Sequence, residues 1–528
     1  RRFVFIMGRM NMESSDNIYE CIVVGAGPGG IVATKELLEN GFDNVLCLEQ
    51  SGGIGGVFAK GYDNLELTSS ATFSMFSDFL NKPGEENHFW SKEEAVSYWK
   101  RYADRFDVTQ KILFDTKVTK VSRKDEGEWV LETNSQAFLA RRIVLATGNN
   151  SAESYPGWTE KLTDIDYSHS KKYKNASQYA GKRVLVVGGG ESASDIALEV
   201  SQVADQCWIS LRESAGWVVP RKRGKYATDI STHRGVWDLP RHYGAYFTRR
   251  SIEIEKSKND PLFDAVAMLN SRIPDPKGIW STYGTKTIAL AEAIAHYNCK
   301  VVEEVTEVED GGKHLVCADG MRLEDIDAVV FSTGYKNITN FMPEEYRQCD
   351  PRHLYKHMIH KDMGESLCWI GVARPGFGSQ FPIMEMQARY FALLCAGRLK
   401  LPDEAAMTES IKQDYEDNMA QFGKNAKRIR SLVDYFRYMD GLADIIGCKP
   451  PLKEYFRRHP LIWLTIMYGP TQATQYRLVG PGSKKREAHK IIKQLPVSKF
   501  NNVVKIGFRM RLAHALDSIN GFAQQKLL

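Results

Sequence analysis

The sequence predicts an α/β protein with two Rossmann-type, three-layer dinucleotide-binding domains, the second inserted into the first. Each domain is indicated by one glycine-rich fingerprint: Gly25-Ala26-Gly27-Pro28-Gly29-Gly30 and Gly188-Gly189-Gly190-Glu191-Ser192-Ala193. Each fingerprint follows a buried-type apolar strand and opens a helical stretch, which is the context that gives such a pattern meaning. The insertion is indicated because the chain returns to apolar strands of the first domain after the second domain closes.

The second strand of each βαβ unit is followed by a charged residue, which is acidic in the first unit and basic in the second. Glu49 and Arg212 both stand 24 positions after the first glycine of their fingerprint (49 − 25 and 212 − 188). A carboxylate at this corner accepts hydrogen bonds from ribose hydroxyls, whereas a guanidinium suits the 2′-phosphate of NADPH. We therefore predict FAD or NAD at the first site and NADP at the second. The glycines allow positive φ and let the pyrophosphate approach a helix N-terminus.

Composition limits the remaining possibilities. With 528 residues, 43% of them hydrophobic and 26% charged, the chain is typical of a globular protein of two or three domains. None of the nine cysteines forms a CxxC pair and the histidines form no HExxH, so we predict a reducing, cytoplasmic location and no metal site. The net charge of +5 is small for this length and does not indicate nucleic acid. The start lacks the long apolar stretch of a signal peptide, and no apolar run reaches 18 residues.

The C-terminal segment is basic, with ten Lys or Arg against two acidic residues between 484 and 528. Apolar residues at helical spacing over 503–522 are compatible with peripheral contact to an anionic membrane surface. A helix that packs on its own domain or on a partner subunit, as in a homodimer, gives the same pattern and is the more common use of such a helix. These alternatives stay open at the level of sequence.

The chain divides into five regions in order. We predict a tail (1–17), the first part of the FAD-binding domain (18–152), the NADPH-binding domain (153–330) with a helical insertion at about 224–285, the second part of the FAD-binding domain (331–445), and a helical, basic extension (446–528). Within them we expect a helix over Tyr98 to Phe106, a loop from Arg374 to Pro382, and a helix beginning near Met384.

Further residues are predicted to contact the two cofactors. A flexible glycine turn follows Glu49, and small-residue turns close both domains after a buried strand. With the fingerprints, Glu49 and Arg212, the predicted cofactor-binding residues are Gln50, Gly56, Val57, Phe58, Val118, Ala146, Thr147, Gly148, Thr333, Gly334, Tyr335 and Gln380.

Several ordered motifs together resemble one family. They are Gly25 to Gly30 with Glu49, Ser77-Asp78-Phe79, His169 to Lys174, Gly188 to Asp195, Ser332 to Tyr335, Glu385 to Arg389, and Gln475 to Gly482. Over nearly all of residues 18–496 the chain is similar to the class B flavin-containing monooxygenases, and in particular to the animal-type, single-component enzymes. The resemblance implies FAD and NADPH as cofactors and O₂ as a substrate. It also implies a C4a-hydroperoxyflavin that oxygenates a small organic molecule at a soft nitrogen, a soft sulfur or a carbonyl.

The departures from the family pattern bear on the chemistry. Thr163 and Ile165 replace the Phe and Gly of the signature, and Glu191 replaces the asparagine that follows the second fingerprint. The family asparagine that faces the flavin aligns with Thr68, followed by Ser69. A hydroxyl donates one hydrogen bond but lacks the paired donor and acceptor of an amide. By this alignment Thr68 and Ser69 are the predicted catalytic residues.

Two other functions stay open beside oxygenation. Some single-component halogenases resemble this family, and a halogenase (brominase) of phenolic substrates would need a lysine or comparable donor near the flavin. An NADPH oxidase would release H₂O₂ instead of product. The sequence does not identify the substrate: aromatic residues are dense at 224–285 and 435–475, a pattern that more often indicates core than a substrate pocket.

Overall fold

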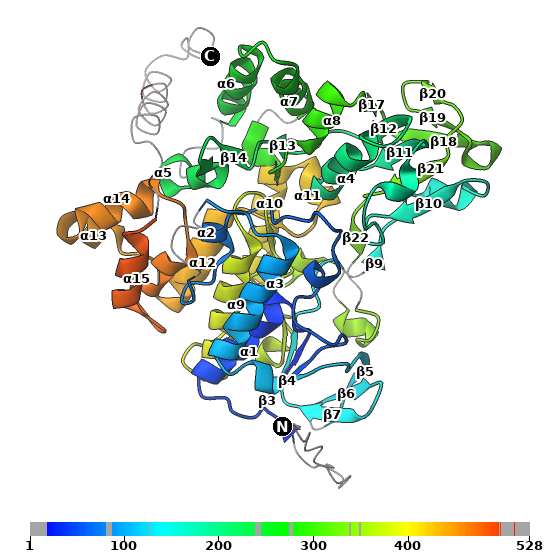
Figure 1. The fold of residues 1–528 in the computed structure, drawn as a ribbon. Coiled ribbons are helices and arrows are strands. Elements are labelled where there is room, and N and C mark those ends of the chain that lie inside the picture. Colours follow the sequence, from blue (N-terminus) through cyan, green and yellow to red (C-terminus); the bar gives the residue numbers. More distant parts are fainter. Residues whose placement is uncertain are drawn as a thin grey trace, which may run out of the picture.

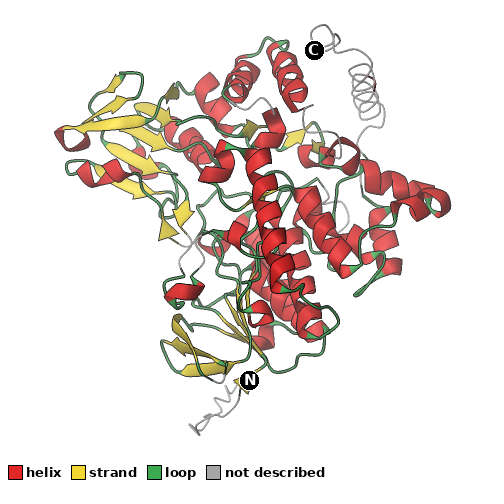
Figure 2. Cartoon of the chain, turned by 180° about the vertical axis from the view of Figure 1, so that it is seen from behind, coloured by secondary structure: helices red, strands yellow, loops and turns green. Residues whose placement is uncertain are grey.

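The computed structural model describes residues 18–495, 497 and 512, apart from 81–86, 126, 151, 238–243, 274–277, 337–338 and 348–349. The predicted tail (1–17) and nearly all of the basic segment at 503–522 lie outside the described residues, and with them the basis for the membrane and subunit alternatives. The strands gather in two separate regions, with helices between and beside them (Figure 2). In the described part of the chain, no helix is both long and apolar enough to cross a membrane.

The first sheet has five parallel strands. Its order is β23 (Leu367–Trp369), β8 (Ile143–Leu145), β2 (Cys21–Val24), β3 (Val45–Leu48) and β4 (Ile112–Leu113). Four of the strands are short and almost wholly buried, as expected for a parallel sheet covered on both faces, whereas the edge strand β4 is partly exposed. A smaller sheet of β1 (Ile18–Tyr19), β7 (Ala137–Ala140), β6 (Trp129–Thr133) and β5 (Val118–Arg123) packs beside it.

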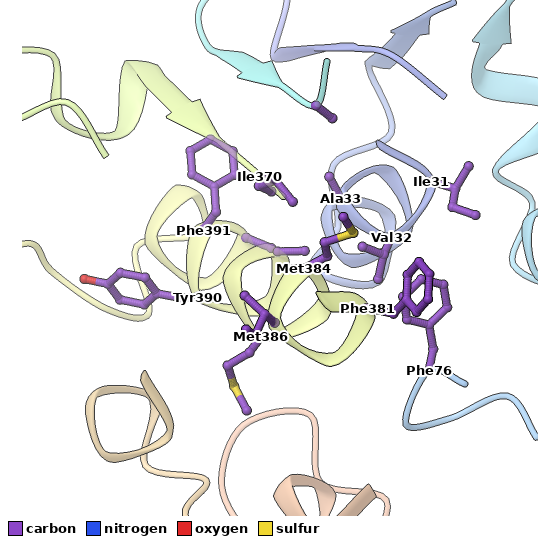
Figure 3. Packing of buried hydrophobic residues seen from close by; sticks show 14 of the residues in the cluster. Ile31, Val32, Ala33, Phe76, Ile370, Phe381, Met384, Met386, Tyr390 and Phe391 are labelled. Atoms are coloured by element: carbon purple, nitrogen blue, oxygen red, sulfur yellow. The ribbon is translucent and has the colours of Figure 1, made fainter. Parts of the chain in front are cut away.

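Helix α1 (Pro28–Glu39) starts at the first fingerprint and packs against α9 (Gln380–Cys395), a helix from the second half of the domain. Figure 3 shows Val32 and Ala33 of α1 beside Met384 of α9. The contact is close at Gly29, where a Cβ would lie 3.7 Å from the Met384 sulfur of α9 and 3.4 Å from the carbonyl oxygen of Ile370. This packing fixes the N-terminus of α1 over the sheet.

The second sheet repeats this plan with five parallel strands. Its order is β10 (Asp166–His169), β21 (Ala328–Phe331), β11 (Arg183–Val187), β12 (Gln206–Ser210) and β17 (Lys300–Val302). Helices α4 (Glu191–Ser201) and α8 (Ala289–His296) pack on it, and β18 (Val305–Glu309), β19 (His314–Cys317) and β20 (Arg322–Leu323) form an adjoining antiparallel sheet. Both connections between the domains pass through one antiparallel pair, β9 (Ala152–Glu153) with β22 (Tyr335–Lys336).

The insertion and the C-terminal extension are helical. The insertion contains α5 (Arg234–Trp237), α6 (Gly244–Lys256) and α7 (Pro261–Ser271), with the two short pairs β14–β15 (Lys222–Arg223, Tyr226–Ala227) and β13–β16 (Trp217–Val218, Gly284–Thr285). The second half of the flavin domain adds α10 (Glu404–Phe422), α11 (Lys424–Arg428), α12 (Tyr435–Ile446) and the pair β24–β25 (Arg374–Pro375, Leu432–Val433). The extension forms α13 (Leu452–Arg458), α14 (Pro460–Tyr468) and α15 (Lys485–Ile492) on one side of the molecule (Figure 1).

Two helices begin earlier than the sequence predicts. The helix expected from Tyr98 is α3 (Lys92–Arg105): a capping box between Ser91 and Glu94 starts it with a polar turn that carries no apolar period. The helix expected near Met384 is α9, which begins at Gln380. Pro382 lies in its first turn, where the missing N–H costs nothing because the first four helical N–H groups have no intrahelical partner.

Candidate active site

The first fingerprint forms a turn that only glycine can make. Gly25 has φ +106°, and a Cβ there would lie 2.7 Å from the carbonyl oxygen of Ala146. A Cβ on Gly30 would lie 1.7 Å from the carbonyl oxygen of Gly25. Both glycines therefore serve the close approach of β2, α1 and the turn Ala146-Thr147-Gly148 that closes the domain.

Gly27 serves a different purpose. Among the described residues, a Cβ on Gly27 would have only Gly56 within 4 Å, at 3.9 Å, so the space above the turn is open. Gly27 is also the N-cap of α1, and no side chain caps the free N–H groups there. An open concavity at an uncapped helix N-terminus fits a dinucleotide pyrophosphate.

Glu49 lies where the sequence predicts, at the end of β3 and beside this turn. Its carboxylate is 5% exposed and accepts the N–H of Ala26 at 2.7 Å and the N–H and hydroxyl of Ser51 at 2.9 and 2.7 Å. A carboxylate has about four acceptor sites, so capacity remains for a ribose hydroxyl. These bonds hold the carboxylate in place before any ligand binds.

The other residues predicted for the first site are spread around the turn. Gly56 has φ +56°, and the Val57 side chain is 46% exposed at the surface of the fold. Phe58 stacks at a tilt on Trp99, and Gln50 is exposed. Val118 is different because it is buried in the core of the small sheet.

The second fingerprint repeats the geometry of the first. Gly188 has φ +130°, and a Cβ there would lie 2.4 Å from the carbonyl oxygen of Ser332, just as Gly25 meets Ala146. Gly190, the N-cap of α4, has no atom of the described part of the chain within 4 Å of its Cβ position. The second site thus has the same concavity for a pyrophosphate. Ser192 and Ala193 continue α4, and Ala193 is fully buried at the position of Gly30.

Glu191 places an unexpected carboxyl group at this anion-binding turn. It accepts the N–H of Lys286 at 3.3 Å. Burial raises the pKa of Glu191, although Arg374 and Lys286 oppose the shift. A raised pKa makes this carboxyl group easier to protonate than an exposed glutamate, which lessens its repulsion of a phosphate.

The turn that closes the second domain lies at the connection between the domains. The Thr333 hydroxyl donates to the carbonyl oxygen of Ser154 at 2.5 Å, and Gly334 adopts φ +84°. The buried His169 makes a 3.0 Å hydrogen bond to the Gly334 carbonyl oxygen and packs edge-on against Tyr335. The matched signature histidine therefore supports the backbone of this turn.

The predicted catalytic pair lies near the N-terminus of α9. The Ser69 hydroxyl lies 2.9 Å from the Ser74 hydroxyl and donates to the hydroxyl of Ser379 at 3.4 Å. Ser379 is the N-cap of α9, and the next residue, Gln380, donates to the carbonyl oxygen of Gly371 at 2.6 Å. The structure thus brings Ser69 to the Ser379–Gln380 segment. Thr68 is half-buried on the same bend.

Two further residues reach this junction that the sequence did not indicate. Asp229, from the insertion, accepts the N–H of Ser70 at 2.7 Å. Lys286, from the NADPH domain, places its ammonium nitrogen 3.8 Å from Asp229 Oδ2. Lys286 Nζ, Asp229 Oδ1 and the Ser70 hydroxyl are buried and have no hydrogen-bond partner among the described residues. The junction therefore contains polar groups with free hydrogen-bonding capacity, from three separate segments.

A buried ion cluster beneath α1 supports this site. Arg477 is 1% exposed and donates to Glu36 of α1 and Glu385 of α9, both at 2.7 Å, and to the Ser77 hydroxyl at 2.7 Å. Asp78 lies 3.6 Å from Arg477. The cluster joins three segments that carry the family resemblance (Ser77-Asp78-Phe79, Glu385 to Arg389 and Gln475 to Gly482), so their role is to hold α1 against α9.

Three carboxylates lie close enough together to form a metal site. Glu36, Glu39 and Asp78 have ligand atoms within 4.8 Å of one another. The Lys35 ammonium lies among them, at 2.9, 2.7 and 2.6 Å respectively. The lysine therefore fills the position that a cation would take.

Comparison with known proteins agrees with this architecture. Residues 19–506 match the flavin-binding monooxygenase-like family. The chain is 34% identical to 4-hydroxybenzoate brominase (decarboxylating) of Pseudoalteromonas luteoviolacea, over 90% of this chain and 92% of that protein. It is 29% identical to dimethylaniline monooxygenase (N-oxide-forming) 2 of Oryctolagus cuniculus, over 87% and 88%.

Solved structures share the fold at low sequence identity. S-allyl-L-cysteine S-oxygenase of Allium sativum superposes with a TM-score of 0.59 at 17% identity, over 90% of this chain and 98% of that one. Cyclohexanone monooxygenase of Rhodococcus sp. Phi1, bound to NADP⁺, gives a TM-score of 0.58 at 18% identity, over 82% and 98%. With two matching dinucleotide turns and a family match across nearly all of its length, this chain belongs to the flavin-binding monooxygenase-like family, whose members are oxidoreductases that use FAD and NADPH.

Proposed function

We propose that the enzyme transfers one oxygen atom from O₂ to a soft nitrogen, a soft sulfur or a carbonyl group of a small organic substrate. NADPH and a proton supply the two reducing equivalents, so the second oxygen atom leaves as water. The observation that carries this proposal is the junction itself. Ser69, Ser70, Asp229 and Lys286 bring buried polar groups together from three segments, and Glu191 of the second turn accepts the N–H of Lys286. Atoms of Ser70, Asp229 and Lys286 there have no hydrogen-bond partner among the described residues.

Binding and orientation are the main tasks of the protein. The turn at Gly27 with Glu49 would hold FAD, and the turn at Gly190 with Arg212 would hold NADPH. When bound, the two cofactors supply hydride transfer and the activation of O₂. The two domains bring these turns to one junction, so positioning is built into the fold.

The junction residues act on protons and water. Hydroxyls of Thr68 and Ser69 would donate hydrogen bonds where negative charge develops during oxygen transfer. Phe73 and Tyr435 are 0% and 3% exposed and pack edge-on in the adjoining core. They keep bulk water away from this region. Support from two hydroxyls replaces the single amide of the family pattern.

Product analysis tests the proposal directly. The holoenzyme is incubated with NADPH and O₂ over a panel of amines, sulfides, ketones and phenols, each with and without bromide. We expect an oxygenated product whose yield does not depend on bromide. NADPH consumption that gives only H₂O₂ with every substrate would overturn the proposal.

Bromination of a phenolic acid is a second candidate function. The 34% identical relative is a 4-hydroxybenzoate brominase, and the structure adds a buried lysine, Lys286, at the junction. Its ammonium has no hydrogen-bond partner among the described residues. This is the kind of donor that halogenation requires near the flavin.

The Lys286→Met variant distinguishes the two functions. If the enzyme brominates 4-hydroxybenzoate, this variant loses the brominated product while bromide-independent NADPH oxidation continues. Lys222→Met, at an exposed lysine of the same domain, is the matched control. Oxygenated product without bromide in the unmodified enzyme, together with no brominated phenol, would eliminate this candidate.

A further inference from the structure

A basic hollow lies at the corner where the second site would hold the 2′-phosphate. Its volume is about 330 Å³, and its lining residues are Arg212, Glu213, Lys424, Lys427 and Arg428. Four cations and one carboxylate give the lining a formal charge of +3 (4 − 1). Only Arg212 and Glu213 come from the NADPH domain. The other three belong to α11, in the second half of the flavin domain.

Helix α11 is held at this corner by contacts with the NADPH domain. Asn425 donates from Nδ2 to the carbonyl oxygen of Ser281 at 2.9 Å, and Gln421 donates to the carbonyl oxygen of Trp280 at 3.2 Å. Arg428 contacts the Tyr283 hydroxyl at 3.4 Å. These contacts place Lys424 and Lys427 beside Arg212 although more than 200 residues separate them in sequence (424 − 212 = 212).

The cations of the hollow are weakly paired. The Lys424 ammonium lies 3.7 Å from Glu213 and the Arg212 guanidinium 4.0 Å from Glu304, and their side chains are 79% and 56% exposed. Exposed pairs at such distances contribute little, so exchanging them for contacts to a dianionic phosphate is favourable. A 2′-hydroxyl, as in NADH, offers no charge to this cluster.

We propose that Lys424 and Lys427 complete the 2′-phosphate site that Arg212 begins, so that both domains determine the preference for NADPH. The proposal rests on the use of NADPH in the proposed function. Arg221, another cation of the same domain, is not among the residues that line this hollow: its guanidinium lies 3.6 Å from Glu66 and 3.8 Å from Asp195.

Calorimetric binding to the oxidised, FAD-loaded enzyme tests this site without turnover. The probes are NADP⁺, NAD⁺ and adenosine 2′,5′-bisphosphate. In the Lys424→Gln/Lys427→Gln variant we expect roughly five- to thirtyfold weaker binding of NADP⁺ and of the bisphosphate, from two contacts of the size of exposed charge pairs. Binding of NAD⁺ should be unchanged. The Lys400→Gln/Lys412→Gln variant removes two exposed charges from the same half of the flavin domain and serves as the matched control.

The outcomes separate this inference from the proposed function. Unchanged NADP⁺ binding in the Lys424/Lys427 variant, with loss in Arg212→Ala, would overturn the role of α11 and leave NADPH use intact. Equal binding of NADP⁺ and NAD⁺ by the unmodified enzyme would overturn both. If the double variant loses FAD, the single Lys427→Gln variant at normal flavin content replaces it, and selective weakening of NADP⁺ is again the supporting result.

Discussion

Replacement of Arg477 by glutamine should weaken the flavin site from a distance. Arg477 is 1% exposed and bridges Glu36 of α1, Glu385 of α9 and the Ser77 hydroxyl, each at 2.7 Å. Glutamine keeps a polar group, but it is shorter than arginine and carries no charge. Glu385 would lose its cationic partner, and Glu36 would keep only Lys35, at 2.9 Å.

The size of the effect follows from burial. Removing one partner of a buried ion pair costs about 3–5 kcal/mol, because the charge that is left behind is uncompensated. For a domain of this size about 1 kcal/mol lowers the unfolding temperature by roughly 2–4 °C. We therefore expect the temperature of flavin release to fall by roughly 6–20 °C, because α1 carries the turn that holds the pyrophosphate.

The assay is a thermal ramp that follows the fluorescence of released FAD. Arg322→Gln is the control, since Arg322 makes two ion pairs with Glu309 and Glu324 at the surface of the NADPH domain. We expect no measurable change for this control. A shift in the Arg477 variant no larger than that of the control would refute the argument that the buried cluster holds α1 in place.

Three other predictions concern the site itself. Glu49→Ala should lower the FAD occupancy of the purified enzyme, because the carboxylate beside the first turn is lost. The ratio of flavin to protein absorbance measures this occupancy, and full occupancy in the variant would contradict the placement of Glu49 at the ribose. The Thr68→Ala/Ser69→Ala variant should keep FAD and hydride transfer but form less product per NADPH and more H₂O₂, as hydrogen-bond support for oxygen transfer falls; an unchanged ratio of product to NADPH would count against both residues. Burial raises the pKa of Glu36, but Arg477 and Lys35 outweigh it and lower the pKa from 4.5 to about 2. Because the folded-state pKa of Glu36 is depressed, its contribution to stability is complete above about pH 4.5 and is lost as the pH falls through about 2. Flavin release should therefore increase as the pH is lowered across this window. In the Arg477→Gln variant the increase should begin at a higher pH.

Local pattern was enough to predict the nucleotide turns. The strand, glycine turn and helix of each fingerprint are contiguous, and the charged corner lies at a fixed distance along the chain, so Gly25, Gly188, Glu49 and Arg212 could be placed without knowing the fold. The backbone of the structure agrees with this prediction, because Gly25 and Gly188 both have positive φ and lie against the turn that closes their domain. The helix starts were less predictable, because the capped first turn of α3 is polar.

Contacts between distant segments could not be predicted in this way. Asp229 comes to the junction from the insertion and Lys286 from the position directly after β16, and neither carries a local pattern. Lys424 and Lys427 resemble ordinary solvent-exposed lysines until α11 is packed on residues 280–283. The aromatic residues were ambiguous for the same reason; Trp280, Tyr435 and Phe436 are buried at 2–4%, as core residues are.

The pairing of β9 with β22 has a consequence for how enzymes of this kind diversify. The inserted domain enters and leaves through neighbouring strands, so its two ends lie together, as in domains that tolerate transplantation. The host sheet does not depend on the insert for its order, because β8 and β23 pair directly with each other. Recombination could therefore exchange the nicotinamide module as one contiguous stretch of gene. Only the matching surfaces, such as the 2.7 Å hydrogen bond from Tyr62 to Asp195 and the contacts of α11, would then need to adapt to the new neighbour.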